Sequence, residues 1–245
     1  MAARSIMYHD VVENGDFASS GFPGEGAHVY KLARPDFERH LDAIGTREVT
    51  LTFDDGGKSF LHPIADLLEA RGRRGYFFIT TGRIGTPGFL TAAEVCELHT
   101  RGHVVGSHSA THPTRMAALN RSELDREWRT SLEHLSTLLH QPVTVASVPG
   151  GYYSREVGRS AAAAGITNLF TSEPTAYVGR LDGCLILGRY VIKRGMAAHW
   201  SEGFAAGNPA FCLRQTALWK AKRIAKALGG SAYLKAREAI LEKKG

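Results

Sequence analysis

Cysteine is scarce in this sequence, and its distribution excludes two common kinds of site. The 245 residues contain three cysteines, which lie far apart at Cys96, Cys184 and Cys212. An odd number of widely spaced cysteines fits neither a disulfide framework nor a cysteine-based zinc site. We therefore expect buried, reduced thiols, as in a cytoplasmic protein.

Long hydrophobic runs are missing as well. No stretch approaches the ~20 apolar residues that a membrane-spanning helix needs. The N-terminal stretch "MAARSIMYHDVV" has a short apolar run that ends at Asp10 and Glu13, which is not the pattern of a secretory signal. The sequence also contains no internal repeat and no low-complexity segment. These absences favour a cytoplasmic globular protein.

Short apolar segments alternate with helix signals along residues 1–210. Candidate strands cover residues 6–8, 49–53, 75–80, 103–107, 143–148, 166–171 and 185–192. Helix starts are indicated by Pro35, by a capping box from Thr91 to Glu94, and by Ser122 before a long amphipathic stretch. Gly72 and Gly102 stand where helices end. The alternation predicts an α/β domain over residues 1–210, with a mainly parallel sheet, outer helices and a barrel slightly smaller than the eightfold one.

Positive charge is concentrated at the C-terminal end. The formal net charge is +6, and apolar residues recur at helical spacing among lysines and arginines from residue 214 to 244. We predict a basic amphipathic helical extension over residues 211–245, broken at Gly229 and Gly230. It could pack on the barrel with a solvated basic face, or residues 212–245 could contact an anionic inner membrane face. Nucleic acid is not an expected partner, because no aromatic platform or recognised motif accompanies the charge.

The stretch "LTFDDGGKSF" places two adjacent carboxylates, Asp54 and Asp55, at the end of a strand. Two like charges repel each other and lose hydration when they are buried. Gly56 and Gly57 allow a sharp backbone turn, so that both carboxylates could face one point. The pattern therefore indicates a cation at that point.

A second motif, "GSHSATHP", also follows a strand and carries His108 and His112. The four-residue spacing brings two imidazoles to one side, where they can hold one metal ion. With Asp55 they make two histidines and one carboxylate, which leave coordination positions open for water and substrate. Asp54 would then stand beside the metal as a base. Zinc is the default for this ligand set, and cobalt, nickel or iron would also fit.

Together, "LTFDDG" and "HSATHP" resemble the first two signature motifs of the polysaccharide deacetylases, the NodB-homology group of carbohydrate esterase family 4. The resemblance covers about residues 5–200. It implies a distorted (β/α)7 barrel that removes N-acetyl or related acyl groups from sugars with the help of a metal. It also implies that Asp54 is the general base and that Asp55, His108 and His112 are the metal ligands.

The stretch "SVPGGYYS", residues 147–154, falls where the family has its third motif. The resemblance implies that Pro149 lines the substrate groove and that the backbone N–H of Gly150 helps to hold the oxyanion. Tyr152 and Tyr153 could stack on a sugar ring or simply be partly buried. The arginine that commonly orients the base is absent from this motif, where Ser147 or a neighbour stands instead.

An arginine from elsewhere could replace it, and the sequence leaves Arg180, Arg189 and Arg194 as candidates. The histidine that usually acts as general acid near the C-terminus is missing too. The N-terminal stretch "SIMYHDVV" carries a similar motif, as in the circularly permuted biofilm poly-N-acetylglucosamine deacetylases. We therefore expect His9 to be the general acid, ahead of His199.

The predicted function is metal-dependent deacetylation of an N-acylated sugar or glycan. The expected cytoplasmic location favours a precursor made inside the cell, which could be linked to a lipid at the inner membrane face. Two alternatives stay open: a catalytically silent carbohydrate-binding barrel, and a hydrolase that acts on a non-sugar amide at the same metal site.

Overall fold

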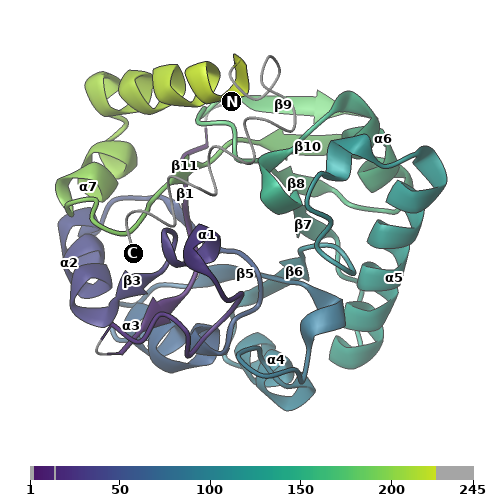
Figure 1. Ribbon diagram of the computed structural model, residues 1–245, viewed down its shortest axis with the longest axis horizontal. Coiled ribbons are helices and arrows are strands. Elements are labelled where there is room, and N and C mark those ends of the chain that lie inside the picture. Colours follow the sequence, from purple (N-terminus) through teal and green to yellow (C-terminus); the bar gives the residue numbers. More distant parts are fainter. Residues whose placement is uncertain (1–2, 14, 225–245) are drawn as a thin grey trace.

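A computed structural model describes residues 3–13 and 15–224 of the chain (Figure 1). Within this part, one curled sheet has nine strands in the order β11-β1-β4-β5-β6-β7-β8-β10-β9. Its strands are β1 (Ser5–Tyr8), β4 (Thr50–Phe53), β5 (Gly75–Ile79), β6 (Val104–Ser107), β7 (Val145–Ser147), β8 (Asn168–Phe170), β9 (Val178–Leu181), β10 (Cys184–Leu187) and β11 (Tyr190–Val191). All neighbouring pairs are parallel except β9 and β10. A separate parallel pair joins β2 (Val11–Val12) to β3 (Leu32–Ala33).

Most helices lie outside the curled sheet, whereas the short α1 lies over its middle in the view of Figure 1. The helices are α1 (Glu25–His28), α2 (Arg34–Ile44), α3 (Asp66–Glu69), α4 (Ala92–Thr100), α5 (Arg121–Leu139), α6 (Arg155–Ala163) and α7 (His199–Ala206), followed by a helix over residues 209–224. Among the helices of the described part of the chain, none combines the length and apolarity needed to span a bilayer. The predicted α/β class and barrel-like arrangement are confirmed.

One predicted strand, residues 185–192, was wrong as a single element. The chain forms β10, bends at Gly188 and Arg189, and then forms β11 on the other edge of the sheet. A Cβ at Gly188 would lie 2.4 Å from the carbonyl oxygen of Glu173, so the chain passes too closely for any other residue. The antiparallel strand β9 was not predicted, because its residues are neither continuously apolar nor strictly alternating.

Helix starts follow the predicted chemistry, with one correction. Pro35 lies in the first turn of α2, and Thr91 forms the capping box of α4 with Glu94. The long helix α5 is capped by Asn120 rather than Ser122. The Asn120 side chain accepts a hydrogen bond from the backbone N–H of Glu123, whose carboxylate reaches back to the N–H of Asn120. Asn120 was missed because both residues are good caps and only the reciprocal pairing distinguishes them.

The core lies between the sheet and the outer helices and is rich in aromatic rings. Phe53 stacks on Phe77 with ring centroids 5.0 Å apart, and Tyr8 stacks on Phe53 at 5.7 Å. All three side chains are fully buried. Full burial of such a side chain contributes roughly 1.5–3 kcal/mol. This packing fixes the ends of β1 and β4, from which the functional loops emerge.

The sheet stays open between its edge strands β11 and β9. The helix over residues 209–224 covers the β11 edge, where the Gln215 side chain bonds both the N–H and the carbonyl of Val191 at 2.9 and 2.8 Å. An amide side chain thus satisfies the backbone groups that a neighbouring strand would take. The predicted boundary between residues 1–210 and 211–245 stays a prediction, and the predicted break at residues 229–230 lies outside the described residues.

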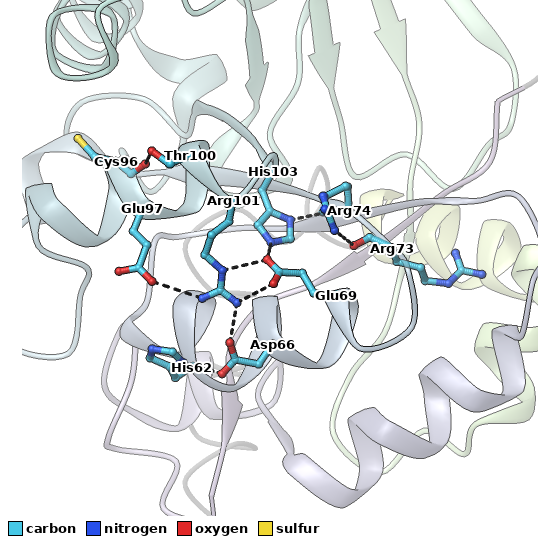
Figure 2. A network of polar contacts seen from close by, with 11 residues as sticks. His62, Asp66, Glu69, Arg73, Arg74, Cys96, Glu97, Thr100, Arg101 and His103 are labelled. Atoms are coloured by element: carbon cyan, nitrogen blue, oxygen red, sulfur yellow. Dashed lines mark hydrogen bonds and ion pairs between the residues drawn. The ribbon is translucent and has the colours of Figure 1, made fainter.

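A polar network ties together the segments around the starts of β5 and β6 (Figure 2). The Arg101 guanidinium, at the end of α4, donates to Glu69 at 2.9 Å and to Asp66 at 2.6 Å. His103 donates to Glu69 through Nε2 and accepts from the N–H of Gly75 through Nδ1. The amino ends of the strands are therefore held by ion pairs and hydrogen bonds, while the opposite ends carry the motif residues.

Candidate metal centre and active site

The two adjacent carboxylates lie at the carboxyl end of β4 and point at different partners. Asp55 has a φ of 92° and Gly56 a φ of 93°, so the chain turns sharply here as predicted. Asp55 meets the two histidines, whereas Asp54 meets Arg189. The expectation that one cation explains both carboxylates is therefore corrected, because the charge of Asp54 has its own fixed partner.

Gly57 has a different role from a flexible turn residue. Its φ is −63°, which any residue can adopt. A Cβ there would lie 1.8 Å from the carboxylate of Asp10. Glycine is needed because the buried Asp10 carboxylate passes directly over the backbone.

Asp55, His108 and His112 form a compact group of potential metal ligands. Each offers one ligand atom, and these atoms lie within 4.8 Å of one another. Nε2 of each histidine is 3.4 Å from the same oxygen of Asp55. Among the described residues, no lysine or arginine pairs with Asp55. A buried carboxylate facing two imidazoles with no fixed cation suits a divalent metal with nitrogen and oxygen ligands.

The charges in this group shift its pKa values in opposite directions. Burial raises the pKa of Asp55, but hydrogen bonds from His108 and His112 outweigh it and leave the pKa well below its usual value. Burial lowers the pKa of His112, and the contact with Asp55 outweighs that effect and raises it. Asp55 is therefore ionised at neutral pH, as a metal ligand must be.

The loop that carries the two histidines is organised by Glu127, a buried residue of α5. Its carboxylate accepts hydrogen bonds from the N–H groups of Ala110 and Thr111 at 3.0 and 2.9 Å, and from the Thr111 hydroxyl at 2.7 Å. His112 has a φ of 58°, in the left-handed region. No local sequence pattern indicated Glu127, because it follows the loop by more than a dozen residues.

Asp54 is held on both oxygens by Arg189. The guanidinium donates to Oδ1 at 2.7 Å and to Oδ2 at 2.8 Å, and both residues are almost fully buried. Burial raises the pKa of Asp54, but the Arg189 and His108 charges outweigh it and leave the pKa below its usual value. Of the three candidate arginines, Arg189 therefore contacts the predicted base. Arg180 lines a cavity at β9, and Arg194 lies over Phe17.

Ser147 connects the predicted base to a predicted ligand. Its hydroxyl donates to Oδ1 of Asp54 at 3.1 Å. Nδ1 of His108 lies 2.5 Å from the same hydroxyl and 3.2 Å from the Ser147 carbonyl. Donation from Nδ1 to the carbonyl would select the tautomer in which Nε2 of His108, now in contact with Asp55, can bind a metal. The residue in the expected arginine's place thus orients two members of the site.

His9 follows β1 and lies beside this group. Burial lowers its pKa. The charges of Asp55 and Asp54 act in the opposite direction but do not outweigh burial. Its ring packs on Tyr30 at 4.8 Å, and its Nδ1 is buried with no hydrogen-bond partner in the described residues. The runner-up, His199, lies at the start of α7 against Trp200. The position of β1 between β11 and β4 suits a permuted barrel, but the permutation stays a prediction.

The third motif forms a tight turn over residues 149–151. Gly150 has a φ of 63°, and Pro149 before it is buried. The Arg115 guanidinium lies 5.7 Å from the Tyr152 ring. Tyr153 turns toward a cavity of about 400 Å³ beside β9 and β10 and packs on the core. The structure therefore separates the two tyrosines, and their contact with substrate stays a prediction.

The model of a known family, described as polysaccharide deacetylase, matches residues 43–169. The match covers more than half of the 245 residues. The chain belongs to the polysaccharide deacetylase family. The matched segment contains Asp54, Asp55, both loop histidines and the third motif. His9 and Arg189 lie outside it.

Curated relatives agree with this assignment. A putative polysaccharide deacetylase, YxkH from Bacillus subtilis, is 28% identical over 149 residues, which are 61% of this chain and 53% of the relative. The chitooligosaccharide deacetylase of a Bradyrhizobium strain is 29% identical over 182 residues, 71% of this chain and 80% of the relative. The chain thus spans about half the length of the Bacillus relative.

Solved structures of other deacetylases share the fold. A polysaccharide deacetylase from Bacillus cereus has a TM-score of 0.70 at 17% identity and covers 84% of this chain and 69% of its own. PplD from Streptococcus pyogenes, solved with acetate, has a TM-score of 0.67 at 18% identity and covers 81% of this chain and 96% of its own. IcaB from Ammonifex degensii has a TM-score of 0.65 at 19% identity and covers 84% of this chain and 96% of its own. At these identities the likeness supports the fold.

Proposed function

We propose that this protein is a metal-dependent N-deacetylase that hydrolyses the acetamido group of an N-acylated sugar. The proposal is carried by one observation: a group of potential metal ligands and a buried carboxylate held by an arginine lie side by side at one end of the sheet. Asp55 and two histidines offer a metal site, and Asp54 lies beside them with its position fixed by Arg189.

Asp55, His108 and His112 would hold the metal, with zinc as the default. A divalent ion bound there supplies Lewis acidity, which polarises the amide carbonyl and lowers the pKa of water at that point. Asp54 is ionised and buried, so it can take a proton from the attacking water. The bidentate contact with Arg189 fixes the direction in which the carboxylate can accept that proton.

Two further groups complete the proposed reaction. The N–H of Gly150 would stabilise the tetrahedral oxyanion, and one such donor contributes roughly 3–4 kcal/mol. His9 would donate a proton to the departing amine, a step that contributes about 10²–10⁴-fold. Burial lowers the pKa of His9 and opposes the protonated form that this donation requires, and the charges of Asp55 and Asp54 offset that effect only in part.

The test is acetate release from N-acetylglucosamine oligomers by the purified protein. Asp54→Asn should abolish release, because the amide cannot take a proton from water. His9→Gln should lower release by about 10²–10⁴-fold. His199→Ala is the matched control and should leave release unchanged. Full activity of Asp54→Asn would contradict the proposed base.

A catalytically silent sugar-binding barrel is the alternative from another class. Its support was the missing third-motif arginine together with the displaced general acid. The contact of Arg189 with Asp54 weakens that support, because a guanidinium reaches the base from the β10–β11 bend. A hydrolase acting on a non-sugar amide would use the same residues, and metal binding without acetate release would favour it.

The location and the lipid-linked substrate are proposals that rest on sequence composition. Within residues 209–224, Lys220, Lys222 and Arg223 are exposed. Their joint change to glutamine should reduce binding to anionic vesicles if this helix lies on the inner membrane face. This triple variant is a sharper test than truncation at residue 212, which would also remove the Gln215 contact with β11. Unchanged vesicle binding would contradict the membrane proposal.

A further inference from the structure

An arginine-lined cavity lies at the end of the sheet opposite the metal site. It has a volume of about 700 Å³. Its arginines come from the segments before β1, β4 and β5: Arg4, Arg47, Arg71, Arg73 and Arg74. Thr50 at the start of β4 lines it, whereas Asp54 follows the end of β4, and four strand residues separate such points by ~13 Å. This cavity is therefore distinct from the candidate active site.

The cavity has more positive than negative charge. Arg47 pairs with Glu202 at 3.1 Å and Arg71 with Asp42 at 2.8 Å. Glu48 is the one acidic residue among those that line the cavity. Five guanidiniums therefore face three carboxylates, which leaves two positive charges in excess.

Three of the arginines have no carboxylate partner in the described part of the chain. Arg4 makes no side-chain hydrogen bond or ion pair there. Arg73 donates to the backbone carbonyls of Gly45 and Arg47, and Arg74 donates to the carbonyl of Arg73. Figure 2 shows the contrast with Arg101, whose guanidinium is surrounded by the carboxylates of Asp66, Glu69 and Glu97.

A structural role accounts for part of this cluster. Arg47 donates to the carbonyls of Ala43 and Ile44, and so caps the end of α2. Capping occupies one nitrogen of a group that has five N–H donors. It gives no reason for Arg4 or Arg74. Like charges around one cavity repel each other unless an anion lies among them.

We propose that this cavity binds a phosphate-bearing anion, with a diphosphate as the simplest form that several guanidiniums can contact at once. Guanidinium groups bind phosphate oxygens through paired, charge-assisted hydrogen bonds. Burial lowers the pKa of Arg73. This shift is expected for a partly buried guanidinium that has no carboxylate partner among the described residues. The ligand could come from a soluble phosphate ester or from a lipid headgroup, which share this chemistry. The proposal is independent of deacetylase activity.

Calorimetric titration with inorganic pyrophosphate tests the site directly. We expect binding that weakens as salt screens the charges. Arg4→Ala and Arg73→Ala should each raise the Kd by roughly tenfold or more, as expected for loss of a charged hydrogen bond. Arg4→Ala removes the packing of the guanidinium on Gly207 but no side-chain hydrogen bond or ion pair within the described residues, so its fold should be intact. Arg126→Ala, an exposed arginine of α5, is the charge-matched control and should leave the Kd unchanged.

Two further arms separate the sources of phosphate and the two sites. Sedimentation with phosphatidylcholine vesicles, with or without phosphatidylglycerol, tests a lipid headgroup, and binding there should also depend on Arg4 and Arg73. Asp55→Ala tests whether pyrophosphate binds at the metal site instead, and it should leave the Kd unchanged. Absence of both pyrophosphate and anionic vesicle binding would overturn the proposal. So would binding that Asp55→Ala abolishes and Arg4→Ala leaves intact.

Discussion

At the scale of single residues, the candidate site depends on buried charges that have fixed partners. Asp54 is held by Arg189 and Ser147, and Asp55 faces two histidines. The contacts with Arg189 and with the two histidines favour the ionised carboxylates against burial. In the proposed function, these different partners let the two neighbouring carboxylates take different roles, Asp54 as base and Asp55 as metal ligand.

Removal of the Arg189 guanidinium should leave the charge of Asp54 buried and unpaired. Arg189→Met should therefore lower the free energy of unfolding by about 3–5 kcal/mol and greatly reduce acetate release. The double variant Asp54→Asn/Arg189→Met should be less destabilised than the sum of the two single variants, because no charge is left unpaired. Urea unfolding measures the cycle. Additive effects would show that the two side chains are not coupled.

Asp10 should make stability depend on pH. Burial raises its pKa from 3.8 to about 6. The folded state therefore binds this proton more tightly than the unfolded state, and the contribution of Asp10 to stability falls as pH rises from about 4 to about 6. Above that range, the charged group should cost on the order of 2–3 kcal/mol. It accepts hydrogen bonds from Ser20 and Ser59, which an amide oxygen can also accept.

Asp10→Asn removes this titration and is the natural probe. The unfolding free energy of the variant should rise relative to that of the original protein between pH 4.5 and 7.5. Urea unfolding at both pH values gives the difference directly. A difference that stays constant or falls over this range would contradict the raised pKa of Asp10.

At the scale of elements, loops at the carboxyl ends of neighbouring strands form the site, and a helix outside the sheet holds one of them. Glu127 on α5 satisfies two backbone N–H groups of the histidine loop. The candidate metal ligands after β4 and β6 therefore depend on a helix that contributes no candidate ligand.

Glu127→Ala should leave the N–H groups of Ala110 and Thr111 without partners. We expect a loss of about 2–4 kcal/mol in stability and a metal affinity about 10–100-fold weaker. Glu133→Ala, at an exposed position of the same helix, is the control and should change neither quantity. Metal titration combined with thermal unfolding reports both. Unchanged affinity in Glu127→Ala would mean that the loop keeps its conformation without this carboxylate.

The sequence predicted the elements and residues whose signals are local. The strands before Asp54 and His108, the α4 capping box and the grouping of Asp55 with the two histidines depend on nearby residues or on the order of parallel strands. Glu127 could not be predicted because its contacts join distant parts of the chain. Arg189 was one candidate of three, since only the bend at Gly188 brings it to Asp54.

At the scale of the whole molecule, the two ends of the sheet differ in what their charges do. The carboxyl ends gather the candidate catalytic groups, and the amino ends around β5 and β6 are joined by the Arg101 network (Figure 2). Stability and chemistry should therefore respond separately to substitutions at the two ends.

Arg101→Met tests this separation. The Arg101 side chain is 20% exposed and pairs with three carboxylates. Its loss should lower the unfolding free energy by about 1–3 kcal/mol and leave acetate release per folded molecule unchanged. Arg39→Met breaks an exposed ion pair with Asp36 and should cost less than about 1 kcal/mol. A fall in acetate release that exceeds the loss of folded protein would show that the two ends are coupled.

The most direct test of the central claim is the metal content of the purified protein, measured by elemental mass spectrometry. The account predicts close to one divalent ion per chain, lost in Asp55→Ala, His108→Ala and His112→Ala. Asp54→Asn should keep the ion while losing acetate release, and His199→Ala should keep both. An original protein without metal, or ligand variants that retain metal and activity, would contradict the assignment of this site.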